Sequence, residues 1–282
     1  MADYIIQKAV EVSKVKKKLQ KTLAEYGEQY DAYRKYDGCC AILRDRSTFS
    51  RTGEVYECLN DIADYLHYEY PDFVFIGEAW WPGKGEFNLI SGEFRRIKVS
   101  DRLMFIIHDI IPADDFHNGV CNIGYKDRMA DWGHLDCQYD GRIQLAQGWA
   151  KGTIDPQEKC NELVAEGGYD GLVLRDPAGT WTAGSGTTGE IIKVKQKLSF
   201  DLRVLEVNTA VGEKTGRTVY KLVVDYQGRR LGVGSGVPHL HADVPVVGDI
   251  VEIEAMDYSS DGLLREPRFK GVRFDKTEPD AG

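Results

Sequence analysis

The spacing of apolar residues before Lys197 predicts helices that alternate with buried strands. Apolar residues recur at helical spacing over residues 4–26, where lysines cover the other side, and again over 55–68 and 156–166. We expect Gly27 to end the first helix and residues 183–189 to form a glycine-rich loop. Extended or almost wholly apolar runs predict strands at 32–43, 73–80, 103–111, 171–175 and 191–195. The polar segment 114–140 matches neither pattern.

After Lys197 the pattern changes to short β-rich runs that are separated by glycine-containing turns. These runs cover residues 202–207, 219–225, 230–233, 250–256 and 271–274. Such a series is typical of a small five-stranded barrel of the oligonucleotide-binding kind, the OB-fold. We therefore expect an α+β protein with two domains, residues 1–197 and 198–282, of which the first has antiparallel sheets and flanking helices.

Composition narrows the class of protein. No apolar run approaches the roughly 20 residues of a membrane span, and the first residues lack a signal-sequence pattern, so we expect a cytoplasmic protein with no membrane partner. The six cysteines form no C-x-x-C pair, which disfavours a zinc site or a disulfide framework.

The formal net charge of −9 disfavours broad affinity for nucleic acid, although a local basic patch can still bind it. Two basic clusters stand out, one near each end of the chain: Lys14, Lys16, Lys17, Lys18 and Lys21, and then Arg265, Arg268, Lys270, Arg273 and Lys276. We interpret the first cluster as the solvated face of the predicted first helix.

The segment Lys35-Tyr36-Asp37-Gly38 supplies a candidate nucleophile. A lysine amine must be neutral to attack, whereas its reference pKa is roughly 10.4. Burial or nearby positive charge, from Lys193, Lys195 and a bound divalent metal, would lower the pKa of Lys35. Asp37 would hydrogen-bond or orient the amine, and Gly38 would allow the backbone to approach a phosphate closely. Taken alone, the segment fits equally a turn with an exposed lysine.

Three further segments offer what such a lysine needs. Glu78 and Asp170 each lie beside a glycine at the border of an apolar run, which suits magnesium held jointly with substrate phosphates. Lys193 and Lys195 alternate along a predicted strand and so share one face. Each feature alone also fits an ordinary exposed strand or turn, as does Arg51. The order of the set predicts a nucleotidyl-transfer enzyme.

These segments, with one more, resemble the motifs of the covalent nucleotidyltransferases, which include DNA ligases, RNA ligases and mRNA capping enzymes. In order, the similar segments are Lys35-Tyr-Asp-Gly38, Ser50-Arg-Thr-Gly53, Gly77-Glu78, Asp170-Gly-Leu-Val-Leu174 and Lys193-Val-Lys195. The tail, 261–269 followed by Arg273-Phe-Asp-Lys276, is similar to the last motif of ATP-dependent DNA ligases. The resemblance is nearest to the short phage-type enzymes, and it implies an adenylation domain followed by an OB-fold domain.

The resemblance implies a role for each matching residue. Lys35 would become a lysine–AMP phosphoramidate, Asp170 would bind metal, and Glu78 would contact metal or ribose. Lys193 and Lys195 would neutralise the α-phosphate, and Arg51 would contact the nucleotide or the 5′-phosphate of the nick. His108 would stack on adenine, with Phe105 as the reserve candidate, and the Tyr33 backbone would contact adenine. Arg265, Arg268 and Lys270 would contact nucleic acid. Arg273, Asp275 and Lys276 would orient the pyrophosphate.

The implied cofactors are ATP and Mg²⁺, or Mn²⁺, and the implied partner of a monomeric enzyme is nicked duplex DNA in replication, repair and recombination. NAD is not expected, because only 34 residues precede Lys35. The chain departs from the family pattern at Cys40, where arginine is frequent, at Tyr33, where glutamate is frequent, and at Asp170, which replaces the usual glutamate. Arg44 is the nearest substitute for the missing arginine. RNA ligation, GTP-dependent capping and non-catalytic nucleic-acid binding stay open as alternatives.

Overall fold

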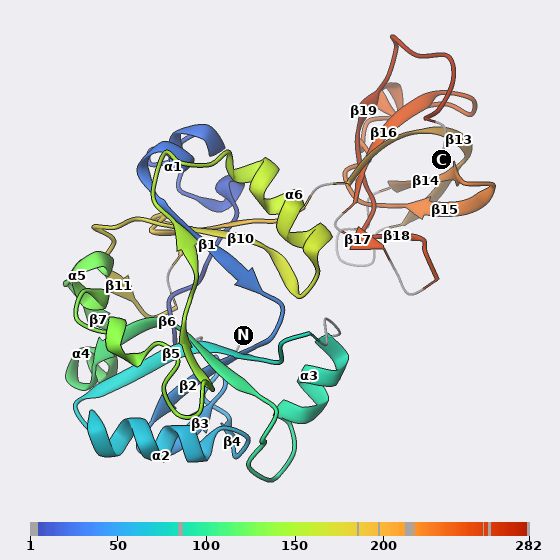
Figure 1. Cartoon of the computed structure of the whole chain (residues 1–282). Coiled ribbons are helices and arrows are strands. Elements are labelled where there is room, and N and C mark those ends of the chain that lie inside the picture. The colour runs from blue at the N-terminus through green and yellow to red at the C-terminus, as the bar shows by residue number, and fades with distance from the viewer. Residues whose placement is uncertain are drawn as a thin grey trace. The chain divides into compact units, whose positions relative to one another are not determined.

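The computed structural model describes residues 5–83, 87–184, 186–196, 198–211, 216, 218–255, 257–258 and 261–280. The chain divides into two compact units, Met1–Lys195 and Gln196–Gly282 (Figure 1). In the described residues, no helix is both long and apolar enough to cross a membrane.

The first sheet of the first unit has four antiparallel strands in the order β12-β10-β1-β9. They are β1 (Asp31–Tyr36), β9 (Gly148–Trp149), β10 (Tyr169–Arg175) and β12 (Ile191–Val194). Helices α1 (Leu23–Gln29) and α6 (Pro156–Glu166) pack on this sheet through a core that contains Tyr26, Leu163 and Leu172.

The second sheet has six strands in the order β4-β3-β2-β5-β6-β8, and only β8 joins its neighbour in parallel. They are β2 (Cys39–Arg44), β3 (Ser47–Phe49), β4 (Val55–Tyr56), β5 (Phe73–Trp80), β6 (Met104–Pro112) and β8 (Ile143–Leu145). Helices α2 (Asn60–Glu69) and α3 (Phe87–Phe94) cover one face of this sheet (Figure 1). Ile62, Ile90 and Phe105 lie fully buried in the core between them.

Short elements fill the region that the sequence left unassigned. They are α4 (Ala113–Asn118), β7 (Val120–Cys121), α5 (Tyr125–Met129) and η2 (Gly133–Leu135), and a later strand, β11 (Trp181–Thr182), joins them. Strands β7 and β11 pair, and Trp181 stacks on Phe116. A polar segment therefore folds here because a few apolar side chains anchor it to the back of the second sheet.

The second unit is a β-structure with its own core. Its main sheet has the order β15-β14-β13-β16-β19, and these strands are β13 (Leu198–Val211), β14 (Thr218–Tyr226), β15 (Arg229–Val233), β16 (Ile250–Ala255) and β19 (Arg268–Val272). The smaller elements are η3 (His241–Asp243), β17 (Asp257–Tyr258) and β18 (Leu264–Arg265). A single bridge joins Ser235, just after β15, to Arg268. Among the described residues, no strand pairing beyond this bridge joins the two edge strands, β15 and β19, into a closed barrel. The OB-fold therefore stays a prediction.

The predicted helix over residues 4–26 is wrong. From residue 5 onward, the described part of the segment contains only a 3₁₀ turn, η1 (Val12–Lys14), before α1 begins. Val10 forms a bridge with Ile192, its amide donates to the Ile191 carbonyl, and its carbonyl accepts from the Lys193 amide. Pairing with the edge strand β12 therefore replaces helical bonding. A capping box at Thr22 and Glu25 then starts α1.

Other expectations differ only at their limits. Gly27 lies inside α1, where an added Cβ would be 2.6 Å from the Cγ of Pro156. The predicted helix over 55–68 begins only at Asn60, because Val55 and Tyr56 pair with β3 as strand β4. The helix over 156–166 is confirmed. Residues 4, 185, 197 and 256, which the predictions included, lie outside the described residues.

Candidate active site

A two-residue turn carries the chain from one sheet of the first unit to the other. Lys35 is the penultimate residue of β1, and β2 begins at Cys39, directly after Asp37 and Gly38. The Asp37 amide donates to the Gly168 carbonyl at 3.1 Å. A Cβ on Gly38 would lie 2.3 Å from the Ala79 carbonyl oxygen and 2.8 Å from Glu78 Cγ. Glycine is required here because the turn presses against the strand that carries Glu78.

A β-bulge places Asp170 beside Lys35. In the pairing of β1 with β10, Lys35 is opposite Gly171 and Tyr36 is opposite Tyr169, so Asp170 is the extra residue. The Lys35 amine donates to Asp170 Oδ2 at 2.5 Å, and Lys195 Nζ lies 3.0 Å from the same oxygen. One carboxylate thus holds two ammonium groups.

A second bulge, in the other sheet, exposes His108. Gly77 is opposite Ile107 and Ile76 is opposite Asp109, which leaves His108 as the extra residue of β6. His108 Nε2 lies 4.0 Å from Glu78 Oε2. The two bulges therefore bring side chains of both sheets toward one site.

The carboxylates control the charge of Lys35. Burial disfavours the charged amine, but Asp170, Glu78 and Asp37 outweigh it, so the pKa of Lys35 is raised. The expectation of a lowered pKa is therefore wrong for the protein alone. Burial raises the pKa of Asp170, yet the adjacent Lys35 and Lys195 hold it below its usual value.

The pKa of Glu78 is raised and that of His108 is lowered, so both side chains favour the neutral form. Burial raises the pKa of Glu78 to about 7, and Asp37 and Asp170 add to the effect while Lys35 and the Gly38 amide oppose it. Burial also lowers the pKa of His108 to about 3, so its ring is neutral near pH 7. A neutral, partly exposed imidazole presents a flat surface for stacking.

The site suits a hard divalent cation that also binds substrate oxygens. Burial chiefly, and Asp37 and Asp170 in addition, raise the pKa of Glu78, and a bound cation would relieve the repulsion among these three carboxylates. Within the described ranges, no three His, Cys, Asp or Glu side chains come close enough together to hold a metal by themselves. Phosphate oxygens would therefore complete the coordination.

Some predicted site residues have other partners. Lys193 Nζ lies 3.7 Å from Glu11 Oε1, rather than beside Asp170 like Lys195. Arg51 lies in the exposed turn after β3. Burial and Glu78 raise the pKa of the Cys40 thiol, and the nearby charge of Arg51 opposes that rise. Tyr33 packs edge-on against Tyr125, with ring centroids 5.7 Å apart.

Two reserve residues do not reach the site. Phe105 is fully buried against Gly77 and the helices of the second sheet, so it cannot stack on a nucleotide. Arg44 lies at the far end of β2, where it contacts the rings of Phe49 and Phe116. Arg44 therefore does not replace the arginine that the family frequently has at the position of Cys40.

Sequence reasoning missed a buried charge network behind the His108 bulge. Arg128 donates from Nε and Nη2 to the two oxygens of Asp109, each at 2.9 Å. Arg175 Nη1 donates to the His108 carbonyl at 2.5 Å and lies 3.3 Å from Asp109 Oδ2. The sequence did carry one indication of this network, namely Asp109 within an almost wholly apolar strand, because a buried carboxylate requires a partner.

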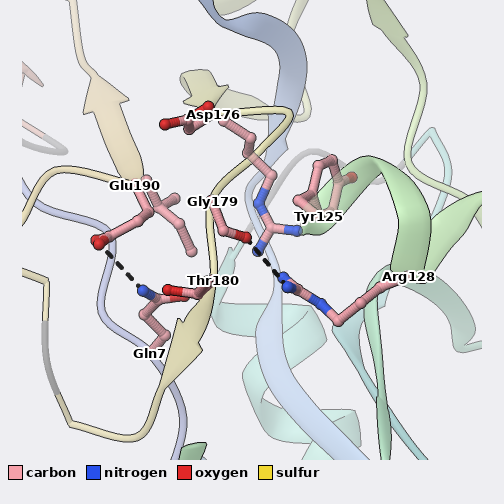
Figure 2. A pocket seen from close by; sticks show the side chains of 9 residues that line it. Gln7, Tyr125, Arg128, Asp176, Gly179, Thr180 and Glu190 are labelled. Carbon is pink, nitrogen blue, oxygen red and sulfur yellow. Dashed lines mark hydrogen bonds between the residues drawn. The ribbon is translucent and has the colours of Figure 1, made fainter. Parts of the chain in front are cut away.

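This network borders a small pocket at the N-terminal segment. Figure 2 shows Arg128 donating to the Gly179 carbonyl and Gln7 donating to Glu190. The Arg175 guanidinium lies over the ring of Tyr125, at 4.3 Å from its centroid. These contacts fix the loop after β10 and the backbone of His108, so the network positions the site from behind.

An aromatic group joins the two sheets beside Lys35. The Trp80 indole, at the end of β5, donates to the Gly168 carbonyl at 3.2 Å and stacks on Tyr169. Tyr36 packs edge-on against both rings. The strands that carry Lys35, Glu78 and Asp170 are thus held together.

The predicted pyrophosphate-orienting residues form a cluster within the second unit. Arg273 Nη1 lies 2.7 Å from Asp201 Oδ2, which Lys276 also contacts, and Arg273 makes two bonds to Asp275. Hydrogen bonds from Arg273 lower the pKa of Asp275 to about 2. Lys270 pairs with Glu254 at 3.1 Å, while Arg265 and Arg268 are exposed on β18 and β19. Asp201 was not predicted.

No family model and no curated protein matches the chain, but solved structures do. Pmar-Lig_Pre aligns with a TM-score of 0.69 at 23% identity over 97% of this chain and 68% of its own. A Lig E DNA ligase gives 0.65 at 18% identity over 95% and 98%. The ATP-dependent DNA ligase of bacteriophage T7, solved with ATP, gives 0.57 at 19% over 95% and 98%.

The chain has the fold of the ATP-dependent DNA ligases. Within this ligase fold, the similarity extends over nearly the whole length of both the Lig E and the T7 proteins. The family resemblance drawn from the motifs is thereby confirmed at the level of the fold. At these identities the likeness concerns the fold, and the chemistry depends on the residues themselves.

Proposed function

We propose that this protein is an ATP-dependent DNA ligase that seals a 5′-phosphate to a 3′-hydroxyl at nicks in duplex DNA. The observation that carries the proposal is the contact of Lys35 and Lys195 with one carboxylate oxygen of Asp170, on a ligase fold. A nucleophilic amine, a second cation and a metal-binding carboxylate are what attack on a phosphoanhydride needs.

In the first step, the Lys35 amine attacks the α-phosphorus of ATP. A P–N bond forms, the bond to the pyrophosphate oxygen breaks, and the amine loses a proton to solvent. Asp170 orients the amine, since its lowered pKa makes it a weak base. Lys195 then faces the charge that develops on the α-phosphate, and the exposed edge of His108 receives the adenine.

A divalent cation bound at Glu78 and Asp170 would supply positive charge for the phosphates and would reduce the carboxylate field that keeps Lys35 protonated. The chain's own residues contribute positioning. Glu78 is fixed by the Gly38 amide, and His108 is fixed by Arg175. The site is therefore assembled before substrate binds.

In the later steps, AMP passes from Lys35 to the 5′-phosphate at the nick, and the 3′-hydroxyl then displaces AMP. We propose that residues 1–197 form the adenylation domain and that residues 198–282 form an OB-fold domain. Arg273, Asp275 and Lys276 would orient the pyrophosphate, and Arg265, Arg268 and Lys270 would contact nucleic acid. Release from Asp201 would be needed before Arg273 and Lys276 could bind phosphate.

Two assays test the proposal. The protein is incubated with Mg²⁺ and α-labelled ATP or GTP, and it is then run on a denaturing gel. We expect label from ATP only, its loss in Lys35→Ala, and its retention in Lys126→Ala, an exposed lysine of α5. Label from GTP would indicate RNA capping, and no label would indicate a non-catalytic binding module.

The second assay is sealing of nicked duplexes whose strands are DNA or RNA. The proposal predicts joining of the all-DNA nick with ATP. Sealing that requires RNA strands would instead assign the protein to RNA ligation.

A further inference from the structure

Residues 14–21, Lys-Val-Lys-Lys-Lys-Leu-Gln-Lys, hold five lysines and no acidic residue in a chain of net charge −9. Their interpretation as one face of a helix fails, because the segment lies before α1 and only its first residue belongs to the η1 turn. We infer that this lysine segment is a surface that binds the phosphate backbone of duplex DNA. The inference deepens the proposed ligase function and rests on it.

The segment has a defined conformation. Val15 is only 4% exposed and packs into the core of the first sheet with Tyr26 and Ile192. The Lys16 amide donates to the Thr187 carbonyl at 2.9 Å, and Gln20 donates from its side chain to the Val12 carbonyl at 3.0 Å. Anchored this way, the backbone displays its lysines outward without a large ordering cost on binding.

Most of these charges are not neutralised by the protein. Lys14, Lys16, Lys17 and Lys18 are exposed, and none forms an ion pair with another residue that the structure describes. Lys21 donates to Gln29 Oε1 at 2.6 Å and lies 5.3 Å from the ring centroid of Tyr30. Four adjacent unpaired cations repel one another, and a polyanion offsets that repulsion.

Several other basic groups of the chain are engaged by neighbouring side chains. Arg96 pairs at 3.0 Å with Glu93, which is buried, and Arg102 lies over the ring of Trp81. In the second unit, Arg273 and Lys276 share Asp201. The lysine segment therefore stands out as positive surface left open to a ligand.

The lysine segment is also continuous with the candidate active site. Val10 bridges to Ile192, the Lys193 amide donates to the Val10 carbonyl at 2.9 Å, and Glu11 pairs with Lys193. Lys193 in turn lies on the strand next to that of Asp170. Phosphates that follow a nick held at Lys35 would thus meet this surface.

A membrane fits the segment poorly. Membrane-surface segments present an apolar face beside their cations, whereas Val15 faces the protein core and Leu19 is left as the partly exposed apolar side chain of residues 14–21. Charge complementarity without an apolar face favours nucleic acid.

The test compares two triple variants of the full chain. In one, Lys16, Lys17 and Lys18 are changed to Gln; in the control, three exposed lysines elsewhere, Lys126, Lys151 and Lys221, are changed to Gln. Binding to a nicked DNA duplex is measured between roughly 50 and 200 mM salt. Because each phosphate contact contributes about 0.9 to the slope of log affinity against log salt, we expect the first variant to lose about 2 to 3 from the slope. The control should lose less than about 1.

Self-labelling with ATP is measured on the same preparations and should be unchanged in the first variant. An unchanged salt slope in a variant that labels normally would overturn the inference while leaving the ligase proposal intact. A lost slope in a protein that never labels would uphold the DNA surface and sink the ligase proposal. A triple Lys→Arg variant keeps the charge, and it should restore the wild-type slope; failure to do so would contradict a backbone-binding role.

Discussion

The buried network at Asp109 gives a quantitative prediction about stability. Asp109 is 1% exposed and lies between two guanidinium groups, those of Arg128 at 2.9 Å and Arg175 at 3.3 Å. Asp109→Asn keeps the side chain's volume but removes the negative charge. Two buried cations then face each other without the anion that separates them.

The expected cost follows from these distances. At an effective dielectric constant of about 20, the attraction within a charge pair near 3.3 Å is roughly 5 kcal/mol. The variant loses this attraction, but part of the loss is offset because it has no carboxylate to desolvate on folding. Removing one partner of a buried pair typically costs about 3 to 5 kcal/mol, which we expect here. For a unit of this size, that lowers the unfolding midpoint by about 6 to 20 °C.

Tryptophan fluorescence provides the assay, because all five tryptophans lie in the first unit: Trp80, Trp81, Trp132, Trp149 and Trp181. The matched control is Asp101→Asn, since Asp101 is 96% exposed and lies 4.0 Å from its partner Arg102. The control should change stability by less than about 0.5 kcal/mol. A cost below about 1 kcal/mol for Asp109→Asn would refute the reasoning that this charge is needed.

Two substitutions and one pH profile address the active site itself. Gly38→Ala should cost about 1 to 3 kcal/mol of unfolding free energy and abolish self-labelling, because its Cβ would collide with the Ala79 carbonyl; normal labelling would contradict this. Since the pKa of Glu78 is raised to about 7, the folded state binds more protons above pH 4.5, and stability should fall as pH rises toward 7. In urea unfolding, the stability of Glu78→Gln relative to the wild type should therefore increase as the pH rises over that range. Parallel plots of stability against pH for the two proteins would contradict this prediction. Finally, the raised pKa of Lys35 predicts a labelling rate that increases with pH above neutrality, and a flat profile would argue that Lys35 is not the group that must lose a proton.

Local patterns predicted those parts of the molecule in which neighbouring residues decide the structure. The helix Pro156–Glu166 has Asp155 as its cap and a proline in its first turn, and both are visible in the sequence. The extended segment 32–43, with a bend at Asp37–Gly38, predicted the two strands that flank this turn. Contacts between distant segments decided the rest. Residues 4–26 have helical spacing, yet the backbone of Val10 pairs with β12 instead, and a helix without tertiary contacts is only marginally stable in water.

The same limit applies to the candidate site. The spacing of Lys193 and Lys195 predicts a shared face, but only the fold shows that Glu11 pairs with Lys193 while Asp170 holds Lys195. The two bulges that expose Asp170 and His108 depend on strand register, which no single segment encodes. The partners of Asp109 lie on α5 and β10, so the sequence could indicate only that partners must exist.

The central claim is that Lys35 carries AMP during the reaction. Its most direct test is a mass spectrum of the protein after incubation with ATP and Mg²⁺, followed by mapping of the modified peptide. The account predicts one added adenylyl group per chain, located on Lys35 and absent from Lys35→Arg. An adduct on another residue, or an unmodified Lys35 in protein that still seals nicks, would contradict it.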